Sequence, residues 1–370
     1  MYFQIVDNNQ KCLKMYVSGD LVDYRDSPEF NKTWRHSVHL ESAENIDYAC
    51  LYSVDGTVES VCPIFILDSW KNTSAKISAI MKSAITAECN LNDYCIYDFI
   101  PPEILTRFLI DKENVIKHVF ENVEKPDHYE ILKKAHILTE EMNAKSNLYN
   151  GELKNTNYSI FGTRTGRLSN KKSSIPILTM KREDRTSLEP SNDLFVELDF
   201  NAAELRTLLA MSGKEQPSVD IHEWARAQTD LSREEMKKRT FAWLYNPEAR
   251  DPLLERFYDR NLVKDKYRTE AGVRTPFFRN IETDDRRALN YIVQSTSSDV
   301  CIEQAYKLRE FFKGSKTKVC YLLHDSVILD FAKEDVGKFL EAKHIFGDTR
   351  FGKYVVNSSI GKNFGEMKEV

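Results

Sequence analysis

The chain has 370 residues, of which 41% are hydrophobic and 29% are charged, and its formal net charge is −5. No apolar run is long enough to cross a bilayer. The first residues lack the basic-then-apolar pattern of a secretion signal, so we expect a cytoplasmic protein with no membrane partner. The seven cysteines form no CxxC pair, which argues against a disulfide framework. This length predicts two or three domains.

Charge is distributed unevenly along the chain. Residues 1–150 carry 15 basic and 23 acidic side chains, which leaves 37 basic and 34 acidic side chains for residues 151–370. The basic side chains of the second half gather in residues 164–185 and again in residues 233–239. Such clusters can bind phosphate even in an acidic chain, although a solvated surface is the commoner explanation of any single cluster.

Residues 1–100 are expected to form a small β-rich domain. Residues 2–6 could pair with residues 12–17 across a polar turn, and the apolar runs on either side of Asp55-Gly56 have the pattern of a second hairpin.

Two amphipathic helices are predicted next, over residues 103–122 and 126–148. After Gly151 the pattern changes to a loop that contains TRTGRLS at residues 163–169. Small hydroxyl residues, a glycine and two arginines suit an extended loop that contacts phosphates.

A strand followed at once by a helix is predicted over residues 195–213. Residues 195–200 are mostly apolar, and Leu205, Leu208 and Leu209 then recur at helical spacing. Asp199 therefore lies at the end of a strand, at an edge where ligands bind in α/β proteins. Asp is also a favoured helix N-cap, and these residues alone favour neither interpretation.

A helix with candidate ligand-binding residues is predicted over residues 232–245. Arg233, Lys237, Phe241 and Tyr245 recur every four residues, so they lie along one face. The cations suit a polyphosphate and the rings suit a base or sugar. The alternative is an ordinary helix with solvated cations and rings packed in the core.

The C-terminal part is predicted to contain a helical segment over 252–268, a turn region at 272–280 and a long helix over 283–312. Asn290 and Gln294 are one turn apart on the long helix, so both amides can contact the same partner.

A buried hairpin is predicted near the C-terminus. Residues 319–323 and 327–331 are apolar strands that flank His324-Asp325-Ser326. A hairpin tip is usually exposed and chemically inert, but an acid at the end of such apolar strands suggests a functional group.

The order and spacing of these segments resemble the family A DNA polymerases, the group of bacterial DNA polymerase I, over roughly residues 126–370. The motifs that carry the resemblance are TGRLS at 165–169, DFNAAELR at 199–206, DIH at 220–222, the stripe of Arg233, Lys237, Phe241 and Tyr245, the set Arg286, Asn290 and Gln294, and HDS at 324–326. The resemblance implies an α+β, right-hand polymerase fold with an antiparallel palm sheet, helical fingers and a reduced helical thumb. The β-rich domain would then span residues 1–100, the thumb-like helices 101–162, and the palm and fingers 163–370.

The resemblance also implies the reaction and its cofactor. Asp199 and Asp325 would be the catalytic residues and, with the backbone carbonyl of Phe200, would hold two Mg²⁺ ions, for which Mn²⁺ can substitute. Two such ions, about 3.5–4 Å apart, assist an in-line phosphoryl transfer to the primer 3′-hydroxyl. The implied partners are a DNA primer-template duplex and deoxynucleoside triphosphates.

Further roles are implied by matching positions. Arg233 and Lys237 would bind the β- and γ-phosphates, Phe241 would stack near the incoming sugar and base, and Glu204 would exclude a 2′-hydroxyl. Tyr245 would occupy the template site between cycles. The nascent pair and the primer end would be contacted by Thr165, Arg167, Arg286, Asn290, Gln294 and His324.

Several positions depart from the family pattern. Ala242 and Asn246 stand where the family usually has glycine, and Ser326 stands where it has an acid, so we expect a reshaped template pocket and a weaker second metal site. The short interval from Tyr245 to Asp325 implies trimmed fingers. Few residues remain for a thumb, so a separate protein could supply the thumb, processivity or exonuclease function. Such trimming suggests a phage or another mobile element.

The N-terminal part carries no exonuclease motif. Asp7 follows the first predicted strand without a partner acid two residues on, so residues 1–100 could be a degenerate exonuclease-like remnant. No cysteine or carboxylate pattern near His36 and His39 completes a metal site. We therefore expect a DNA polymerase without intrinsic proofreading. A single-subunit RNA polymerase is the alternative that Glu204 disfavours, and a non-catalytic primer-template binding subunit is the alternative that the two aspartates disfavour.

Overall fold

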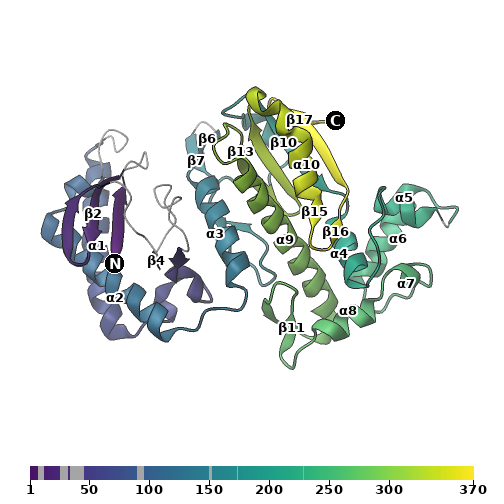
Figure 1. Ribbon diagram of the computed structural model, residues 1–370, viewed down its shortest axis with the longest axis horizontal. Helices are drawn as coiled ribbons and strands as arrows, with labels where there is room; N and C mark the ends of the chain where they lie inside the picture. The colour runs from purple at the N-terminus through teal and green to yellow at the C-terminus, as the bar shows by residue number, and fades with distance from the viewer. Residues whose placement is uncertain are drawn as a thin grey trace. The chain divides into compact units, whose positions relative to one another are not determined.

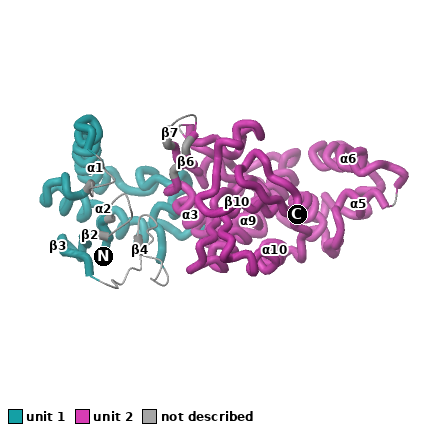
Figure 2. The backbone as a smooth tube through the Cα atoms, turned by 90° about the horizontal axis from the view of Figure 1, so that it is seen from above, with its two compact units in different colours: residues 1–129 teal, residues 130–370 magenta. Residues whose placement is uncertain are grey.

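The structure is a computed structural model that describes residues 1–6, 12–25, 32–33, 46–89, 96–149, 152–172, 174–227 and 229–370. Asp7, His36 and His39 lie outside these ranges. The chain divides into two compact units, Met1–Tyr129 and Glu130–Val370 (Figure 2), whereas the boundaries expected from the sequence lie at residues 100 and 162. Over the described ranges, no helix is both long enough and apolar enough to cross a membrane.

Unit 1 begins with a three-stranded antiparallel sheet. β1 (Tyr2–Val6) pairs with β2 (Cys12–Val17), and β2 pairs with β3 (Asp20–Asp23). Phe3 and Ile5 alternate along β1 and are both buried, as the period of two in a strand requires. The predicted pairing of residues 2–6 with residues 12–17 is therefore confirmed.

The second predicted hairpin, around Asp55-Gly56, is wrong. The residues on either side form the short 3₁₀ helices η2 (Ala49–Tyr52) and η3 (Val58–Ser60). The Asp55 carboxylate accepts hydrogen bonds from the backbone N–H and the hydroxyl of Thr57, at 2.9 and 2.8 Å. These local bonds compete with strand pairing, so the chain turns here without forming a hairpin.

The apolar run expected to be the second strand of that hairpin instead leads into α1 (Ile64–Thr86), which packs against α2 (Pro102–Asn122). The buried residues of α1 are Leu67, Thr73, Ile77 and Ala84. Their spacing of four to seven residues places them on one helical face. Unit 1 is therefore mixed rather than mainly β.

Unit 2 contains a five-stranded antiparallel sheet. β10 (Leu194–Phe200) is the central strand, with β14 (Ser326–Phe331) on one side and β17 (Val356–Gly361) on the other. β13 (Lys318–Leu323) and β18 (Lys368–Glu369) complete the order β13-β14-β10-β17-β18. The strands predicted at residues 195–200, 319–323 and 327–331 are confirmed.

Two helices lie across this sheet, α9 (Asp285–Phe311) and α10 (Phe339–Gly347) (Figure 1). The Phe200 ring of β10 stacks on the Phe346 ring of α10, with ring centroids 4.1 Å apart. This combination of helices with antiparallel strands confirms the predicted α+β class.

A second, mainly helical layer of unit 2 surrounds a separate core that includes Leu208, Trp243 and Ile292. Its elements are α4 (Ala203–Met211), α5 (Ile221–Arg226), α6 (Arg233–Tyr245), α7 (Leu254–Phe257), α8 (Arg260–Tyr267), β11 (Gly272–Arg274) and β12 (Asn280–Glu282). The helices predicted over 232–245 and 283–312 are confirmed. The segment 252–268 is divided between α7 and α8, and the region 272–280 contributes to a short β-hairpin.

The remaining elements are one helix of 15 residues and several short helices and paired strands. They are α3 (Tyr129–Asn143), η4 (Ile96–Phe99), η5 (Asp184–Ser187), η6 (Lys333–Lys338), and the paired strands β4 (Lys32–Thr33) with β5 (Asp47–Tyr48), β6 (Ser146–Tyr149) with β7 (Glu152–Asn155), β8 (Tyr158–Ser159) with β9 (Ser169–Asn170), and β15 (Asp348–Thr349) with β16 (Gly352–Lys353). α3 is shorter than the predicted 126–148 because the chain turns into β6. The two helices expected to form a thumb are separated, since α2 belongs to unit 1 and almost all of α3 to unit 2.

Candidate active site

Two carboxylates lie at one edge of the unit 2 sheet. Asp199 is the penultimate residue of β10 and pairs with Ser326 of β14. His324 and Asp325 form the two-residue loop between β13 and β14, and the backbone N–H of Phe200 donates to the Asp325 carbonyl at 3.2 Å. The alternative role of Asp199 as a helix N-cap is excluded, because the N-cap of α4 is Ala202. The structure thus brings Asp199 and Asp325 together.

Ionisation of both carboxyl groups at this edge of the sheet is unfavourable, because the two charges are partly removed from solvent and repel each other. Burial raises the pKa of Asp199 to about 7, and the charges of Asp325 and Glu197 add to this effect. Burial also raises the pKa of Asp325. In the described chain none of these three carboxylates is ion-paired with a lysine or arginine. That part of the chain also holds no group of three or more His, Cys, Asp or Glu side chains arranged to bind a metal.

Glu204, on the first turn of α4, connects three segments. Its Oε1 accepts a charge-assisted hydrogen bond from Arg167 in the 163–169 loop. Its Oε2 accepts a hydrogen bond of 2.6 Å from the hydroxyl of Tyr245, at the end of α6. Glu204 is therefore ion-paired with Arg167 and hydrogen-bonded to Tyr245.

Arg206, the last residue of the DFNAAELR segment, is a fully buried cation. The sequence alone assigns it no role. Its guanidinium donates to the carbonyls of Asn201, Pro217 and Val219, at 2.7–2.9 Å. Burial lowers its pKa to about 10. Arg206 therefore fixes the connection between α4 and α5, where backbone carbonyls would otherwise be buried without partners.

The helix α6 presents the predicted stripe on a partly exposed face. The buried residues of α6 are Met236, Thr240, Trp243 and Leu244, and Tyr245 is 47% exposed. The rings of Phe241 and Tyr245 are parallel, with centroids 6.0 Å apart. Tyr245 therefore does not belong to the core, and the alternative of core-packed rings does not apply to it.

His222 lies beneath this face. Its side chain is 3% exposed, its ring centroid is 5.8 Å from that of Phe241, and its Nδ1 has no hydrogen-bond partner. Burial lowers its pKa. The DIH motif marked this position in the sequence, but only the structure gives the imidazole an unsatisfied buried nitrogen next to the stripe.

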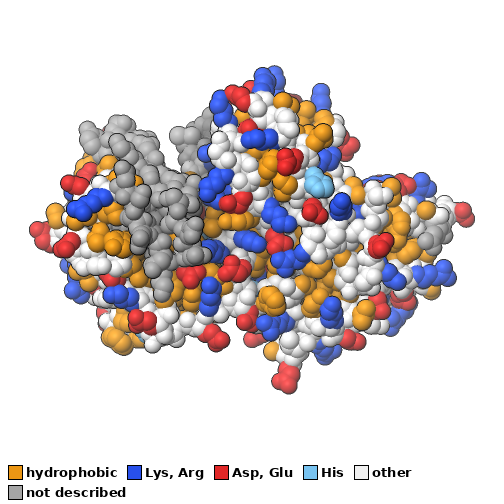
Figure 3. Space-filling view, in the orientation of Figure 1, with side chains coloured by type: hydrophobic (Ala, Val, Ile, Leu, Met, Phe, Trp, Pro, Cys, Tyr) orange, Lys and Arg blue, Asp and Glu red, His pale blue; other side chains and the backbone are white. Residues whose placement is uncertain are grey.

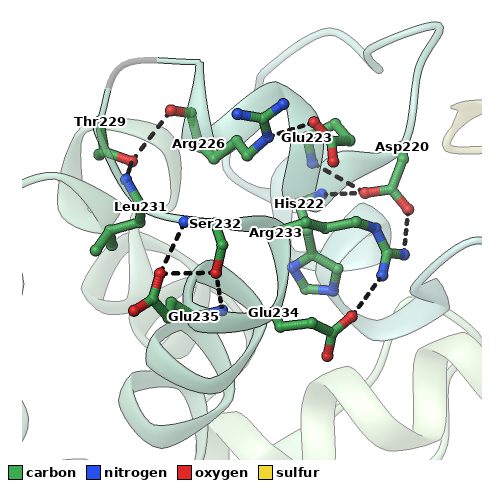
Figure 4. Close-up of polar contacts among 10 residues, drawn as sticks. All are labelled: Asp220, His222, Glu223, Arg226, Thr229, Leu231, Ser232, Arg233, Glu234 and Glu235. Carbon is green, nitrogen blue, oxygen red and sulfur yellow. Dashed lines mark hydrogen bonds and ion pairs between the residues drawn. The ribbon is translucent and has the colours of Figure 1, made fainter.

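Arg233, at the start of α6, is engaged by two acids (Figure 4). Its Nη2 donates to Asp220 at 2.7 Å and its Nη1 to Glu234 at 3.2 Å. Ser232 caps the helix, and Glu235 completes a capping box with it. Lys237, one turn along the same face, is exposed.

A wide cleft of about 970 Å³ opens at the C-terminal end of α6. Its lining includes Tyr245 and Asn246 of the α6 end, Arg286 and Asn290 of α9, and four further cations, Arg250, Arg260, Lys264 and Arg287. Gln294 is half-buried further along α9 and does not line this cleft. On the face of unit 2 drawn in Figure 3, basic side chains alternate with acidic ones, so phosphates would meet small basic groups rather than one continuous surface.

The 163–169 loop is held from beneath by a buried ion pair. Arg279 donates two hydrogen bonds to Asp299, at 2.8 and 2.9 Å. Gly166 has a φ of +74°, and a Cβ there would lie 2.5 Å from the Arg279 guanidinium carbon. Thr165 is buried, whereas His324 is exposed at the hairpin tip with a φ of +47°, a geometry typical of two-residue hairpin loops.

Comparisons with known proteins give similarities at the level of structure only. No known protein family matches the sequence, and no curated protein matches it. The chain is similar to the polymerase domain of Pol1 from M. smegmatis in complex with DNA primer-template and dNTP, with 13% sequence identity and a TM-score of 0.47. The similarity covers 73% of this chain and 55% of that chain, so this chain spans about half the length of the mycobacterial domain.

Proposed function

We propose that this chain is a template-directed DNA polymerase that adds deoxynucleotides to a primer 3′ end, without intrinsic proofreading. The observation that carries the proposal is the pair Asp199 and Asp325, one at a strand end and one at a hairpin tip, which are both half-buried and repel each other. Buried like charges are costly unless something compensates them. Acids with such raised pKa values are typical of functional sites.

The donor set fits Mg²⁺. Carboxylate and carbonyl oxygens are the ligands that hard divalent cations prefer, and the ion would offset the repulsion that raises the pKa of Asp199. Asp199, Asp325 and the carbonyl oxygen of Phe200 would hold two Mg²⁺ ions, and Mn²⁺ could replace them. When bound, these ions would lower the pKa of the primer 3′-hydroxyl and act as Lewis acids toward the phosphates.

The α6 face supports a triphosphate site. Arg233 and Lys237 offer cations in successive turns, and charge-assisted contacts to phosphate are among the strong hydrogen bonds of proteins. The unsatisfied Nδ1 of buried His222 adds a polar group beside them. Phe241, half-buried between the cations and Tyr245, offers a ring against which a sugar or base can pack.

The contacts of Glu204 support selection of deoxynucleotides. Both of its carboxylate oxygens are already engaged, by Arg167 and by the Tyr245 hydroxyl. These two contacts hold the carboxylate in place and leave it little freedom to move aside, so a ribose 2′-hydroxyl would collide with it or displace one of its partners. Either outcome is costly, so the site would disfavour ribonucleotides.

The cleft at the end of α6 supports a site for the template strand. Tyr245 and the cations of the cleft offer ring stacking and phosphate contacts, as single-stranded nucleic acid requires. The partners at the nascent pair and primer end would be Thr165, Arg167, Arg286, Asn290, Gln294 and His324. The sheet would be the palm and α5 to α8 the fingers, and a separate protein could complete the thumb, processivity or exonuclease function.

Primer extension by the purified chain tests this proposal. Wild-type protein, Asp199→Ala and Asp325→Ala would be assayed with Mg²⁺ and with deoxy- or ribonucleotides, and Glu215→Ala serves as a control that removes an exposed carboxylate of the same unit. We expect extension with deoxynucleotides, lost in both aspartate variants although they still bind primer-template. Extension only with ribonucleotides would indicate an RNA polymerase. DNA binding without extension would indicate a non-catalytic subunit.

A further inference from the structure

A continuous chain of hydrogen bonds connects the catalytic strand with the start of α6. The buried Arg206 donates through Nη2 to Asn201 Oδ1 at 3.1 Å, and Asn201 Nδ2 donates to Asp220 Oδ2 at 2.7 Å. Arg233 Nη2 donates to the same Asp220 oxygen at 2.7 Å. Only Phe200 separates Asn201 from Asp199, so this chain connects the proposed metal ligand with the proposed phosphate ligand.

The Asp220 carboxylate uses its two oxygens differently (Figure 4). Oδ1 caps α5 by accepting from the backbone N–H groups of His222 and Glu223, both at 2.9 Å. Oδ2 accepts from Asn201 and Arg233. The N-cap role of an aspartate accounts for Oδ1 alone, so the contacts of Oδ2 require another explanation.

The Asn201 amide is engaged through both its oxygen and its nitrogen. Its Oδ1 accepts from Arg206 and from the backbone N–H of Ile221, at 3.1 and 3.0 Å, and its Nδ2 donates to Asp220. The side chain is 7% exposed. A buried amide with all these contacts has one stable orientation, so it fixes the place of Oδ2 relative to the end of β10.

Arg233 itself is on the surface, with 39% of its side chain exposed. The contacts to Asp220 and Glu234 each use one of its Nη atoms, and a guanidinium has five N–H groups in a planar fork. A long side chain that is already fixed loses less conformational freedom when it binds a ligand. Its orientation is therefore set before any ligand binds.

We propose that Asp220 and Asn201 are positioning residues that hold the Arg233 guanidinium, relative to the strand of Asp199, in the orientation that receives a nucleoside triphosphate. This inference rests on the proposed nucleotide site. Asp220 acts through Arg233 and does not itself contact the nucleotide.

Two isosteric variants test the inference. Asp220→Asn keeps an N-cap oxygen, but its amide nitrogen cannot accept from Arg233 or Asn201. The double variant Asn201→Asp with Asp220→Asn reverses the hydrogen bond between the two side chains, so that residue 220 donates and residue 201 accepts. The double variant keeps the link between β10 and α5 and the total charge. It removes the acceptor of Arg233 and moves one negative charge to residue 201, beside Arg206.

The measurements are the nucleotide KM and kcat in primer extension, equilibrium binding of dNTP with Mg²⁺ by calorimetry to the enzyme bound to a primer that lacks a 3′-hydroxyl, primer-template affinity, and the melting temperature. We expect both variants to raise the nucleotide KM and Kd by about three- to tenfold, with primer-template affinity unchanged. The melting temperature should fall in Asp220→Asn and recover in the double variant. In an Arg233→Ala background, Asp220→Asn should have no further effect on nucleotide binding.

Several results would overturn the inference. An unchanged or lower nucleotide Kd in the double variant would mean that Asp220 is only structural or competes with phosphate for Arg233. An equal effect of Asp220→Asn with and without Arg233 would mean that it does not act through Arg233. If Arg233→Ala alone leaves nucleotide binding unchanged, the proposed nucleotide site is wrong as well. This measurement therefore distinguishes failure of the positioning role from failure of the nucleotide site itself.

Discussion

Replacing Asp199 with asparagine should stabilise the metal-free protein at alkaline pH. The pKa of Asp199 in the folded chain is raised from 3.8 to about 7 by burial and by the charges of Asp325 and Glu197. An acid whose pKa is raised by folding opposes folding when it ionises. The resulting loss of folding free energy is absent below about pH 4, grows as the pH rises from about 4 to 7, and is complete above that.

The size of this cost follows from the shift. Each pKa unit corresponds to about 1.4 kcal/mol, so the ionised Asp199 destabilises the metal-free fold by at most about 4 kcal/mol at pH 8. Asparagine has the same shape and no charge. We therefore expect Asp199→Asn to raise the free energy of unfolding by about 1–4 kcal/mol at pH 8, and the gain to disappear near pH 4.

Urea unfolding in the presence of a chelator, at several pH values between 4 and 8, measures this effect. Asp193→Asn is the control, because the pKa of Asp193 is lowered by its hydrogen bond from the Lys333 backbone, so its replacement should give no gain at pH 8. Added Mg²⁺ should stabilise the wild type and not Asp199→Asn. Equal stability of the two proteins at every pH would refute the electrostatic argument for the site.

Three further predictions concern the proposed reaction. Lys237→Ala should raise the nucleotide KM at least tenfold and leave DNA affinity nearly unchanged, since a charge-assisted contact is worth about 1.5–3 kcal/mol; weaker DNA binding with an unchanged KM would assign α6 to the duplex. Glu204→Ala should raise the kcat/KM for ribonucleotides relative to deoxynucleotides by about tenfold or more, and an unmoved ratio would exclude Glu204 as the gate. The chain should leave a mismatched primer 3′ end intact, and mismatch removal that Asp7→Ala abolishes would show a proofreading site.

Local patterns in the sequence determined the elements that carry the candidate site. The apolar runs of β10 and of the β13–β14 hairpin predicted the strands, and they placed Asp199 at a strand end and Asp325 at a tight turn. The recurrence of Arg233, Lys237, Phe241 and Tyr245 every four residues predicted the stripe on α6. These features depend on the periods of strands and helices, which neighbouring residues set by themselves.

The apolar run near Asp55-Gly56 shows where local patterns are insufficient. A short apolar run suits a strand or a buried helix equally, and packing of α1 against α2 favoured the helix. The predicted turn itself is present, because the Asp55 carboxylate accepts a hydrogen bond from the Thr57 backbone. Tertiary contacts decided that this turn connects two 3₁₀ helices and not two strands.

Only the tertiary structure assigned partners to the charged residues. Glu204 binds Arg167, which is 37 positions away, and Arg233 binds Asp220, which precedes its helix. Arg206 is buried and donates to loop carbonyls, contacts that the helical pattern of its segment does not predict. Ion pairs and buried hydrogen bonds depend on which side chains the fold brings within about 3 Å, and no periodicity in the sequence encodes that distance.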